Sequence, residues 1–203
     1  MVNIGSNTSR KIKDYKLSRY ACYLIAQNAD SKKKVVALAQ TYFAIQTRKQ
    51  ELFEQNYNML SEEEKRIFNR NLTKLGNYEL NQTALKAGVR NFGKFHNAGY
   101  KGLYNGETAD DIARRKSLHY RQDILDHMGS EELADNLFRI VQTESKIRNE
   151  NIIGEDKCNK THYNMGRDIR EFIKNNGGTM PEDLPTPNKS LKEIENKKTT
   201  EIQ

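Results

Sequence analysis

The stretch SKKKVVALAQTYFAIQTRKQELFEQNY, residues 31–57, contains no glycine or proline and has dense apolar spacing. Apolar residues recur in it three and four positions apart, as on one face of a helix: Val35, Leu38, Tyr42 and Ile45. A second apolar face lies beside the first, so we expect the first half of the helix to be buried on most sides. The pattern predicts a helix roughly 40 Å long, around which the other helices pack, with its far end in solvent.

Polar caps and glycines divide the rest of the chain into shorter helices. Ser18 and Thr108 are expected caps, Ser61 with Glu64 forms a predicted capping box, and Gly88 is a predicted helix end. A glycine- and aromatic-rich loop is expected at 92–106 and a polar loop at 151–160. No segment alternates with period two for long, so the sequence predicts an all-α multi-helix bundle around one long helix, without a substantial sheet. The expected helices cover 17–27, 61–87, 108–117, 122–127, 130–147 and 161–176.

The chain has 203 residues, of which 35% are hydrophobic, and its mean hydropathy is −0.92. So polar a composition indicates a lean core with some segments outside it. We expect a helical segment at 1–60, a second helical region at 61–180, and a flexible tail at 181–203, where all three prolines stand.

The sequence also indicates a cellular compartment. It has no run of about 18 apolar residues that could span a membrane, and its N-terminus lacks the apolar core of a secretory signal. Cys22 and Cys158 are solitary and differ in surroundings, which does not suggest a disulfide framework. We therefore expect a cytoplasmic protein that does not associate with membranes.

The net charge is +7 and is unevenly distributed. Residues 1–60 carry 10 Lys and Arg against 4 Asp and Glu, a surplus of six, whereas residues 129–203 carry 12 against 14. A basic field of this kind suggests a polyanionic partner. For any single cluster we favour a solvated helix end, and the case for a binding surface comes from the clusters taken together with the aromatic residues Tyr100 and Tyr104. The candidate nucleic-acid or filament contacts are Lys32, Lys33, Lys34, Arg48, Lys49, Tyr100, Tyr104, Arg114, Arg115 and Lys116.

Tyr100 and Tyr104 allow two interpretations. Aromatic rings beside cations form the surface that single-stranded nucleic acid needs, because bases stack on the rings while phosphates are neutralised. Alternatively, the segment around these tyrosines is a tight turn whose rings pack on the core. The sequence leaves both interpretations open.

Catalytic and metal-binding motifs are not found. The sequence matches neither a nucleophile elbow nor a phosphate-binding loop or a dinucleotide fingerprint. Cys158 and His162 stand at a C-x3-H spacing, but no second pair of ligands is spaced to complete a metal site. We expect no catalytic residues, no metal and no cofactor, hence a protein that is not an enzyme.

Five longer motifs resemble the DNA-damage-inducible protein D (DinD) family. They are LSRYACYLIAQNAD at 17–30, QTYFAIQTRKQEL at 40–52, GYKGLYNG at 99–106, ILDHMGSEELADNLFR at 124–139 and GGTMPEDLP at 177–185. The opening part also resembles the back part of a BRO-N-type domain of phage and viral regulators. Family members usually carry a further N-terminal segment that completes this domain. The chain begins at Met1 without it, so we expect a truncated product or a short variant.

The resemblance implies a damage-response (SOS) protein without catalysis, which acts on recombinase (RecA) filaments assembled on single-stranded DNA. The expected partner is thus this filament or single-stranded DNA itself. The alternative is an antirepressor-type regulator from a phage or mobile element, which binds a repressor protein through apolar surface such as Phe53 or Tyr57. An exposed apolar stretch at Leu52, Phe53 and Tyr57 would also suit a homodimer.

Overall fold

The structure is a computed structural model that describes residues 2–3, 9–10, 15–120 and 122–201. It divides into two compact units, Met1–Met59 and Leu60–Gln203, which we call the N-terminal and the C-terminal unit and describe separately. The predicted all-α class is confirmed. The described strands are only two residues long: β1 (Val2–Asn3) pairs antiparallel with β2 (Ser9–Arg10).

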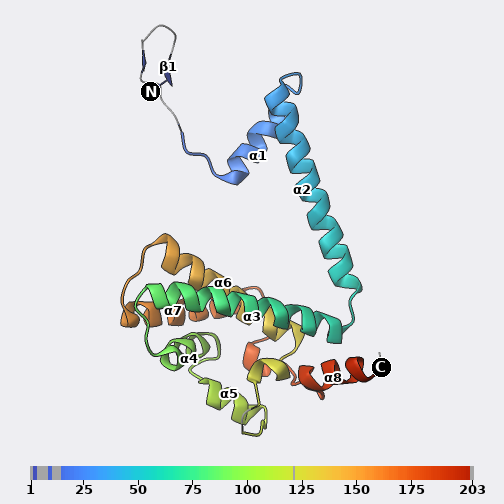
Figure 1. Ribbon diagram of the computed structural model, residues 1–203, viewed down its shortest axis with the longest axis vertical. Helices are drawn as coiled ribbons and strands as arrows, with labels where there is room; N and C mark the ends of the chain where they lie inside the picture. Colours follow the sequence, from blue (N-terminus) through green and yellow to red (C-terminus); the bar gives the residue numbers. More distant parts are fainter. Residues whose placement is uncertain (1, 4–8, 11–14, 121, 202–203) are drawn as a thin grey trace. The chain divides into compact units, whose positions relative to one another are not determined.

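The N-terminal unit is built on a helical hairpin of α1 (Arg19–Asn28) and α2 (Lys34–Met59) (Figure 1). Ser18 caps α1 as predicted, since its side chain accepts a hydrogen bond from the backbone N–H of Ala21. The two helices touch where the rings of Tyr23 and Phe43 meet edge to face, with centroids 5.2 Å apart. The Gln40 amide also donates to a backbone carbonyl of α1, 2.8 Å away.

The expected burial of α2 is wrong. The residues predicted to enter a core are exposed: Val35 by 79%, Leu38 by 62% and Ile45 by 49%. Among the described side chains of this unit only Ala26 is buried. The physical reason is that α1 is much shorter than α2 and covers one side of it, while no other described helix of the unit packs on the other side. Therefore α2 is not the centre of the bundle.

The C-terminal unit holds the core and consists of six α-helices and two 3-10 turns in its described part (Figure 1). Helix α3 packs against α6, α4 against α7, and α6 against α7. Two apolar clusters fill the interior, one around Tyr104, Met128 and Leu133, the other around Leu80 and Phe95. The elements are α3 (Glu62–Lys86), α4 (Phe92–Leu103), α5 (Ala109–Arg115), η1 (Ile124–His127), α6 (Ser130–Asn149), α7 (Glu155–Asn175), η2 (Pro181–Asp183) and α8 (Leu191–Glu201).

Helices α3 and α6 run parallel. The amide of Asn69, in the first half of α3, donates to the carbonyl of Ser130 at the start of α6. The hydroxyl of Thr83, near the end of α3, donates to the carboxylate of Glu144 in the second half of α6. In each pair the two residues are 61 positions apart in the sequence. The offset between α3 and α6 is therefore constant along their length, as for two parallel helices. Two parallel neighbours need a crossover, and α4, α5 and η1 form it.

Helices α4 and α7 approach closely where glycines face the partner backbone. A Cβ atom at Gly102 would overlap the carbonyl oxygen of Tyr163, and one at Gly166 would lie 2.8 Å from the backbone nitrogen of Leu103. Real Cβ atoms do not approach this near, so the crossing requires glycine at both positions. The sequence predicted a loop for this glycine-rich segment. That expectation is wrong, because Asn91 caps the helix by accepting from the Lys94 N–H.

Two other expectations are corrected. The polar segment 151–160 belongs largely to α7, which begins at Glu155 rather than Thr161. The Glu155 carboxylate accepts hydrogen bonds from the backbone N–H groups of Arg90 and Asn91 at 2.7 and 2.9 Å.

The expected flexible tail is ordered through its first part. Leu191 and Ile194 are 2% and 4% exposed, because α8 presents them to the apolar cluster around Tyr104.

The predicted capping box at the start of α3 is confirmed. The Ser61 hydroxyl accepts from the Glu64 N–H at 3.3 Å, and the Ser61 N–H donates to the Glu64 carboxylate at 2.9 Å. We expect Ser61→Ala to lower the free energy of unfolding of the C-terminal unit by about 1 kcal/mol, measured by urea denaturation of the full chain. Ser61→Asp keeps the acceptor and is the control: a loss as large as that of alanine would contradict the assigned role.

Candidate nucleic-acid interface

The N-terminal unit carries nearly all of the net charge. Its 59 residues hold 10 Lys and Arg against 4 Asp and Glu, a surplus of six out of the total of +7. The C-terminal unit has 24 against 23 and is close to neutral. The N-terminal unit is therefore the part of the chain that would attract a polyanion over long distances.

The predicted lysine triplet is displayed at the turn between α1 and α2. The Asp30 carboxylate accepts the backbone N–H of Lys32 at 3.0 Å, and the Asp30 carbonyl accepts that of Lys33 at 3.1 Å. This aspartate turn fixes the backbone while Lys32, Lys33 and Lys34 all remain exposed. The triplet is thus a solvent-facing cationic cluster, as a phosphate contact requires.

The other predicted cations of α2 are less available. Arg48 is exposed, but its guanidinium is 3.0 Å from the Glu51 carboxylate one helical turn away. An exposed pair of this kind is weak and can exchange for a phosphate. The side chain of Lys49 lies outside the described part of the structure.

Exposed aromatic rings accompany the lysines in the same unit. Tyr15 and Tyr20 are 74% and 69% exposed, and Tyr42 is 47% exposed. Only Tyr100 and Tyr104 were predicted from the sequence as stacking residues, whereas Tyr20, Tyr23 and Tyr42 were expected to be buried. The signal was available, because the segment with the largest charge surplus also contains Tyr15, Tyr20, Tyr23, Tyr42 and Tyr57.

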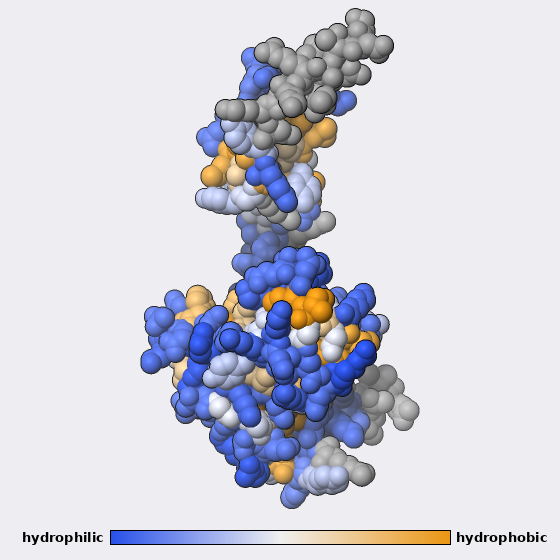
Figure 2. All heavy atoms as spheres, turned by 90° about the vertical axis from the view of Figure 1, so that its left-hand side faces the viewer, coloured by the Kyte–Doolittle hydropathy of each residue, from blue (hydrophilic) through white to orange (hydrophobic). Residues whose placement is uncertain are grey.

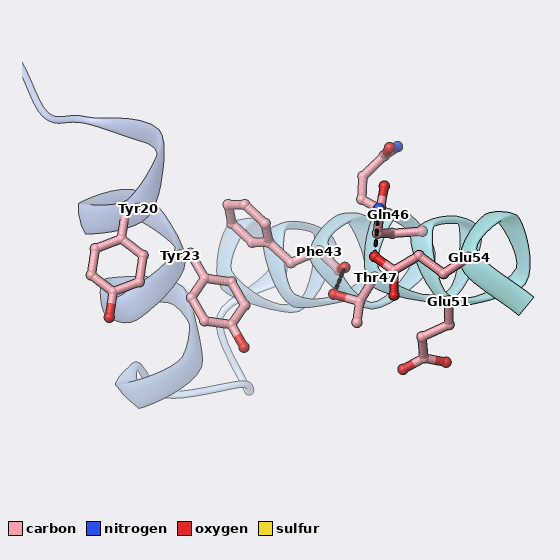
Figure 3. Close-up of a pocket in the computed structure, with 8 residues that line it drawn as sticks. Tyr20, Tyr23, Phe43, Gln46, Thr47, Glu51 and Glu54 are labelled. Atoms are coloured by element: carbon pink, nitrogen blue, oxygen red, sulfur yellow. Dashed lines mark hydrogen bonds between the residues drawn. The ribbon is translucent and has the colours of Figure 1, made fainter. Parts of the chain in front are cut away.

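A groove of about 760 Å³ lies between α1 and the second half of α2 (Figure 3). Tyr20 and Tyr23 line it from α1, and Phe43 and Gln46 from α2, with Glu51 and Glu54 further along α2. The groove combines apolar rings with carboxylates, so it does not suit a phosphate. Phosphate contacts are therefore assigned to the turn that carries Lys32, Lys33 and Lys34, which we call the lysine turn, rather than to this groove.

The structure places Tyr100 and Tyr104 in the core. Tyr100 is 8% exposed and Tyr104 is fully buried, and burial raises the pKa of both hydroxyls. The interpretation of a stacking surface is corrected here: neither ring faces solvent, because the segment is helix α4 and these residues point toward α6. The alternative interpretation, that the rings pack on the core, agrees with this placement.

The three basic residues at the end of α5 are separated by the fold. Arg114 is exposed beside Asp111, with which it forms an ion pair. Arg115 is half-buried, bonded to the Glu107 carboxylate and to the Glu182 carbonyl. Lys116 is buried, and its Nζ lies 2.7 Å from the equally buried Glu132 carboxylate. Arg115 and Lys116 are engaged inside the C-terminal unit, so of this group only Arg114 faces solvent.

Lys116 and Tyr104 belong to a buried polar chain that links α5, α4, α6 and α7. The Tyr104 hydroxyl donates to Glu132 at 3.0 Å and accepts from the Asn136 amide at 2.7 Å, and Arg139 donates to the Asn136 carbonyl oxygen at 3.0 Å. Arg139 also bonds His162 and lies over the Tyr100 ring. Burial raises the pKa of Glu132, while the Lys116 ammonium opposes this shift. This buried network consists of Tyr104, Lys116, Glu132, Asn136, Arg139 and His162.

The histidines of this region are structural. The His162 Nδ1 lies 3.0 Å from the Phe95 carbonyl, which can only accept, so Nδ1 carries the proton and Nε2 accepts from Arg139. Burial, with Arg139 nearby, lowers the pKa of His162 well below its usual range and that of His96 to about 4. Among the described residues no group of three or more potential ligands is placed to hold a metal ion.

Further exposed cations lie on α4 and α7. Lys101, Lys157, Lys160 and Lys174 face solvent there, together with Arg167, which pairs with Asp168. Exposed carboxylates lie among them on α7: Asp156, Asp168 and Glu171. This region offers a comparison surface for the lysine turn.

None of the helices in the described part is both long and apolar enough to cross a membrane.

Fold and comparisons together define the class of protein: an exposed, basic helical hairpin followed by a helical domain that matches the family model "DinD C-terminal domain" over residues 60–194. The match begins where the C-terminal unit begins. The chain is also 52% identical to DNA damage-inducible protein D of Escherichia coli (strain K12) over 200 residues, which is 97% of this chain and 73% of that protein. The chain belongs to the DNA-damage-inducible protein D family.

Proposed function

We propose that the protein acts in the DNA-damage response as a non-enzymatic modulator of recombinase (RecA) filaments on single-stranded DNA. Membership in a family named for induction by DNA damage supports the general role. The observation that carries the molecular part is that the N-terminal unit has a surplus of six positive charges and presents Lys32, Lys33 and Lys34 in solvent.

Each step of the proposed contact uses a described feature. The lysine turn supplies phosphate neutralisation, and the exposed rings of Tyr15 and Tyr20 supply flat surfaces for unstacked bases. A filament holds its DNA extended and repeats the same charge pattern along its length. Several weak contacts of one hairpin can therefore reinforce one another on a filament more than on a short free strand.

Absence of catalysis is part of the proposal. Two titratable groups of the C-terminal unit with shifted pKa values, Glu132 and His162, are fully buried, and their side chains bond Lys116 and Arg139, respectively, inside the buried network. Such shifts accompany structural networks as well as active sites.

The test is binding to labelled single-stranded DNA, with and without recombinase and ATP, at two salt concentrations. We expect Lys32→Glu/Lys33→Glu to weaken filament binding at least tenfold. The slope of the logarithm of the binding constant against the logarithm of the salt concentration should also become shallower, by about 0.7 for each phosphate that is no longer neutralised. The matched control is Lys157→Glu/Lys160→Glu on α7, which makes the same change of charge at exposed positions and should have little effect.

The outcomes separate the alternatives. Binding to bare DNA that fades with salt would define a DNA-binding module. Equal weakening by both double variants would mean a non-specific charge effect, and a loss with the α7 variant alone would move the interface to the C-terminal unit. No binding to DNA or filament would reject the proposal.

A second candidate function is a regulator that binds a repressor protein. Exposed apolar side chains favour it, because Leu52 and Phe53 are 43% and 49% exposed, and Figure 2 shows apolar residues at the surface of the N-terminal unit among hydrophilic ones. Such binding would be insensitive to DNA and to the lysine substitutions. The resemblance to a BRO-N-type domain and the cytoplasmic location stay predictions.

A further inference from the structure

The groove between α1 and α2 has a charge opposite to that of the unit that contains it. The N-terminal unit carries four acidic residues against ten basic ones, and two of the four, Glu51 and Glu54, line this groove. Its described lining residues include no lysine and no arginine. The groove is therefore the part of this unit where a cation, rather than a phosphate, is electrostatically favoured.

The two carboxylates of the groove are open to a new cation to different degrees. Glu54 accepts a hydrogen bond from the neutral amide of Gln50 at 2.7 Å, and no cation among the described residues pairs with it. Glu51 lies 3.0 Å from the Arg48 guanidinium, and the two side chains are 52% and 62% exposed. An exposed pair of this kind contributes little and exchanges readily. Glu54 is thus the first anchor for a cation, and Glu51 the second.

The cationic positions in this half of α2 lie on another side of the helix. At about 100° per residue, positions 48 and 49 are about 140° and 120° away from Phe43 around the helix axis. Glu54 is only about 20° away from Phe43 by the same measure. The groove side of α2 therefore presents carboxylates, and neither Arg48 nor Lys49 lines it.

Aromatic rings form the other end of the groove. Tyr23 is 36% exposed and Phe43 is half-buried, and Figure 3 shows the two carboxylates further along α2. Ring faces attract apolar side chains and also cations. From Phe43 to the carboxylates α2 advances about 12–17 Å. An extended peptide advances about 3.3 Å per residue, so a cationic side chain that covers part of this distance stands about two to four positions from an apolar residue on the rings.

We propose that this groove binds a segment of a partner protein in which an arginine or lysine stands about two to four positions from an apolar residue. The apolar side chain lies against Tyr23 and Phe43, and the cation pairs with Glu54 and Glu51. The inference deepens the proposed function and rests on it only for where the partner is met. A recombinase filament offers phosphates to the lysine turn and protein segments to the groove, and the two contacts together favour the filament over bare DNA.

Fluorescence anisotropy of the full chain with short labelled peptides tests the proposal. The probes consist of glycine and serine with one leucine and one arginine, placed from adjacent to about six positions apart. We expect saturable binding that is tightest at the middle spacings. It should weaken roughly tenfold when glutamine replaces the arginine or serine replaces the leucine. No saturable binding, or binding that ignores both the spacing and the arginine, would overturn the proposal.

Glu51→Gln/Glu54→Gln removes the two carboxylates of the groove and keeps their size. We expect this variant to bind the arginine peptide roughly tenfold more weakly and the glutamine peptide as before. The matched control, Glu79→Gln/Glu131→Gln, removes two exposed carboxylates of the C-terminal unit and should change binding less than about twofold. Circular dichroism checks the helix content of both variants. Equal weakening by both would mean a general effect of net charge and would contradict the groove assignment.

Two other occupants are distinguished by the same assay. The side chain of Arg19 lies outside the described part of the structure. Peptide binding by Arg19→Gln but not by the unaltered chain would mean that the chain's own arginine fills the groove. Self-association in sedimentation equilibrium that is lost in Glu51→Gln/Glu54→Gln would make the occupant a second copy of this chain. Either result would overturn the assignment to a partner protein.

The groove and the proposed function fail separately. Lys32→Glu/Lys33→Glu leaves every lining residue of the groove in place, and Glu51→Gln/Glu54→Gln leaves every cation of the lysine turn. Peptide binding by a chain that binds neither filament nor DNA rejects only the proposed function. Filament binding without any peptide binding rejects only the groove assignment.

Discussion

Glu132→Ala is expected to lower the free energy of unfolding of the C-terminal unit by about 3–5 kcal/mol. The substitution leaves the Lys116 ammonium buried without its carboxylate, and the side chains of this pair are fully inaccessible to solvent. It also removes the acceptor of the Tyr104 hydroxyl. Losses of this size approach the total stability of many domains, so the variant should be largely unfolded at moderate urea concentration.

Two further variants separate charge from packing. Glu131→Ala removes the exposed neighbouring carboxylate and should change stability by less than about 0.5 kcal/mol. Lys116→Met combined with Glu132→Leu removes both charges and should cost clearly less than Glu132→Ala alone. Urea denaturation followed by circular dichroism measures all three. A double variant as unstable as the single one would show that the ion pair is not the main cause.

Gly102→Ala is the second substitution with a large expected effect. Its methyl group would overlap the backbone of α7 at Tyr163 and lie 2.9 Å from the nitrogen of Arg167. Backbone atoms cannot rotate away as a side chain can, so α4 and α7 must move apart. We expect a loss of about 3 kcal/mol, at the upper end of the range for overpacking.

Gly93→Ala is the matched control in the same helix. At this position a Cβ would meet only the Asn91 side chain at 3.5 Å, an ordinary contact. Because alanine favours helix more than glycine, we expect Gly93→Ala to be neutral or to raise stability by up to about 1 kcal/mol. Thermal denaturation of the two variants compares them. Equal losses in the two variants would mean that the close α4–α7 crossing is not the cause of the loss at Gly102.

Local signals in the sequence were sufficient for the helix beginnings. Ser18, Ser61 and Thr108 each cap a helix as predicted, because a cap involves only the next three residues. The Gly88 end was predictable for the same reason, and its φ of +95° is one that glycine adopts without strain. The family and the all-α class were likewise evident from motifs and periodicity.

Tertiary placement was not predictable in the same way. The apolar periodicity of α2 is genuine, but periodicity cannot tell whether the apolar face meets its own chain or another molecule. Tyr104 and Lys116 look like surface residues until Glu132, which is 28 and 16 residues further along, is placed beside them. Of the candidate contacts, Lys32, Lys33 and Lys34 are exposed in one cluster, and their exposure follows from a short local turn.

The parallel packing of α3 against α6 has a consequence for synthesis on the ribosome. The hydrogen bonds of Asn69 and Thr83 cannot form until Ser130 and Glu144, 61 residues further along the chain, have been synthesised. The crossing of α4 with α7 adds a similar delay. Such non-local contacts slow folding, whereas the α1–α2 hairpin can close as soon as it emerges. A nascent chain thus displays its hairpin early, whereas the side of α3 that packs on α6 stays uncovered until α6 has been synthesised.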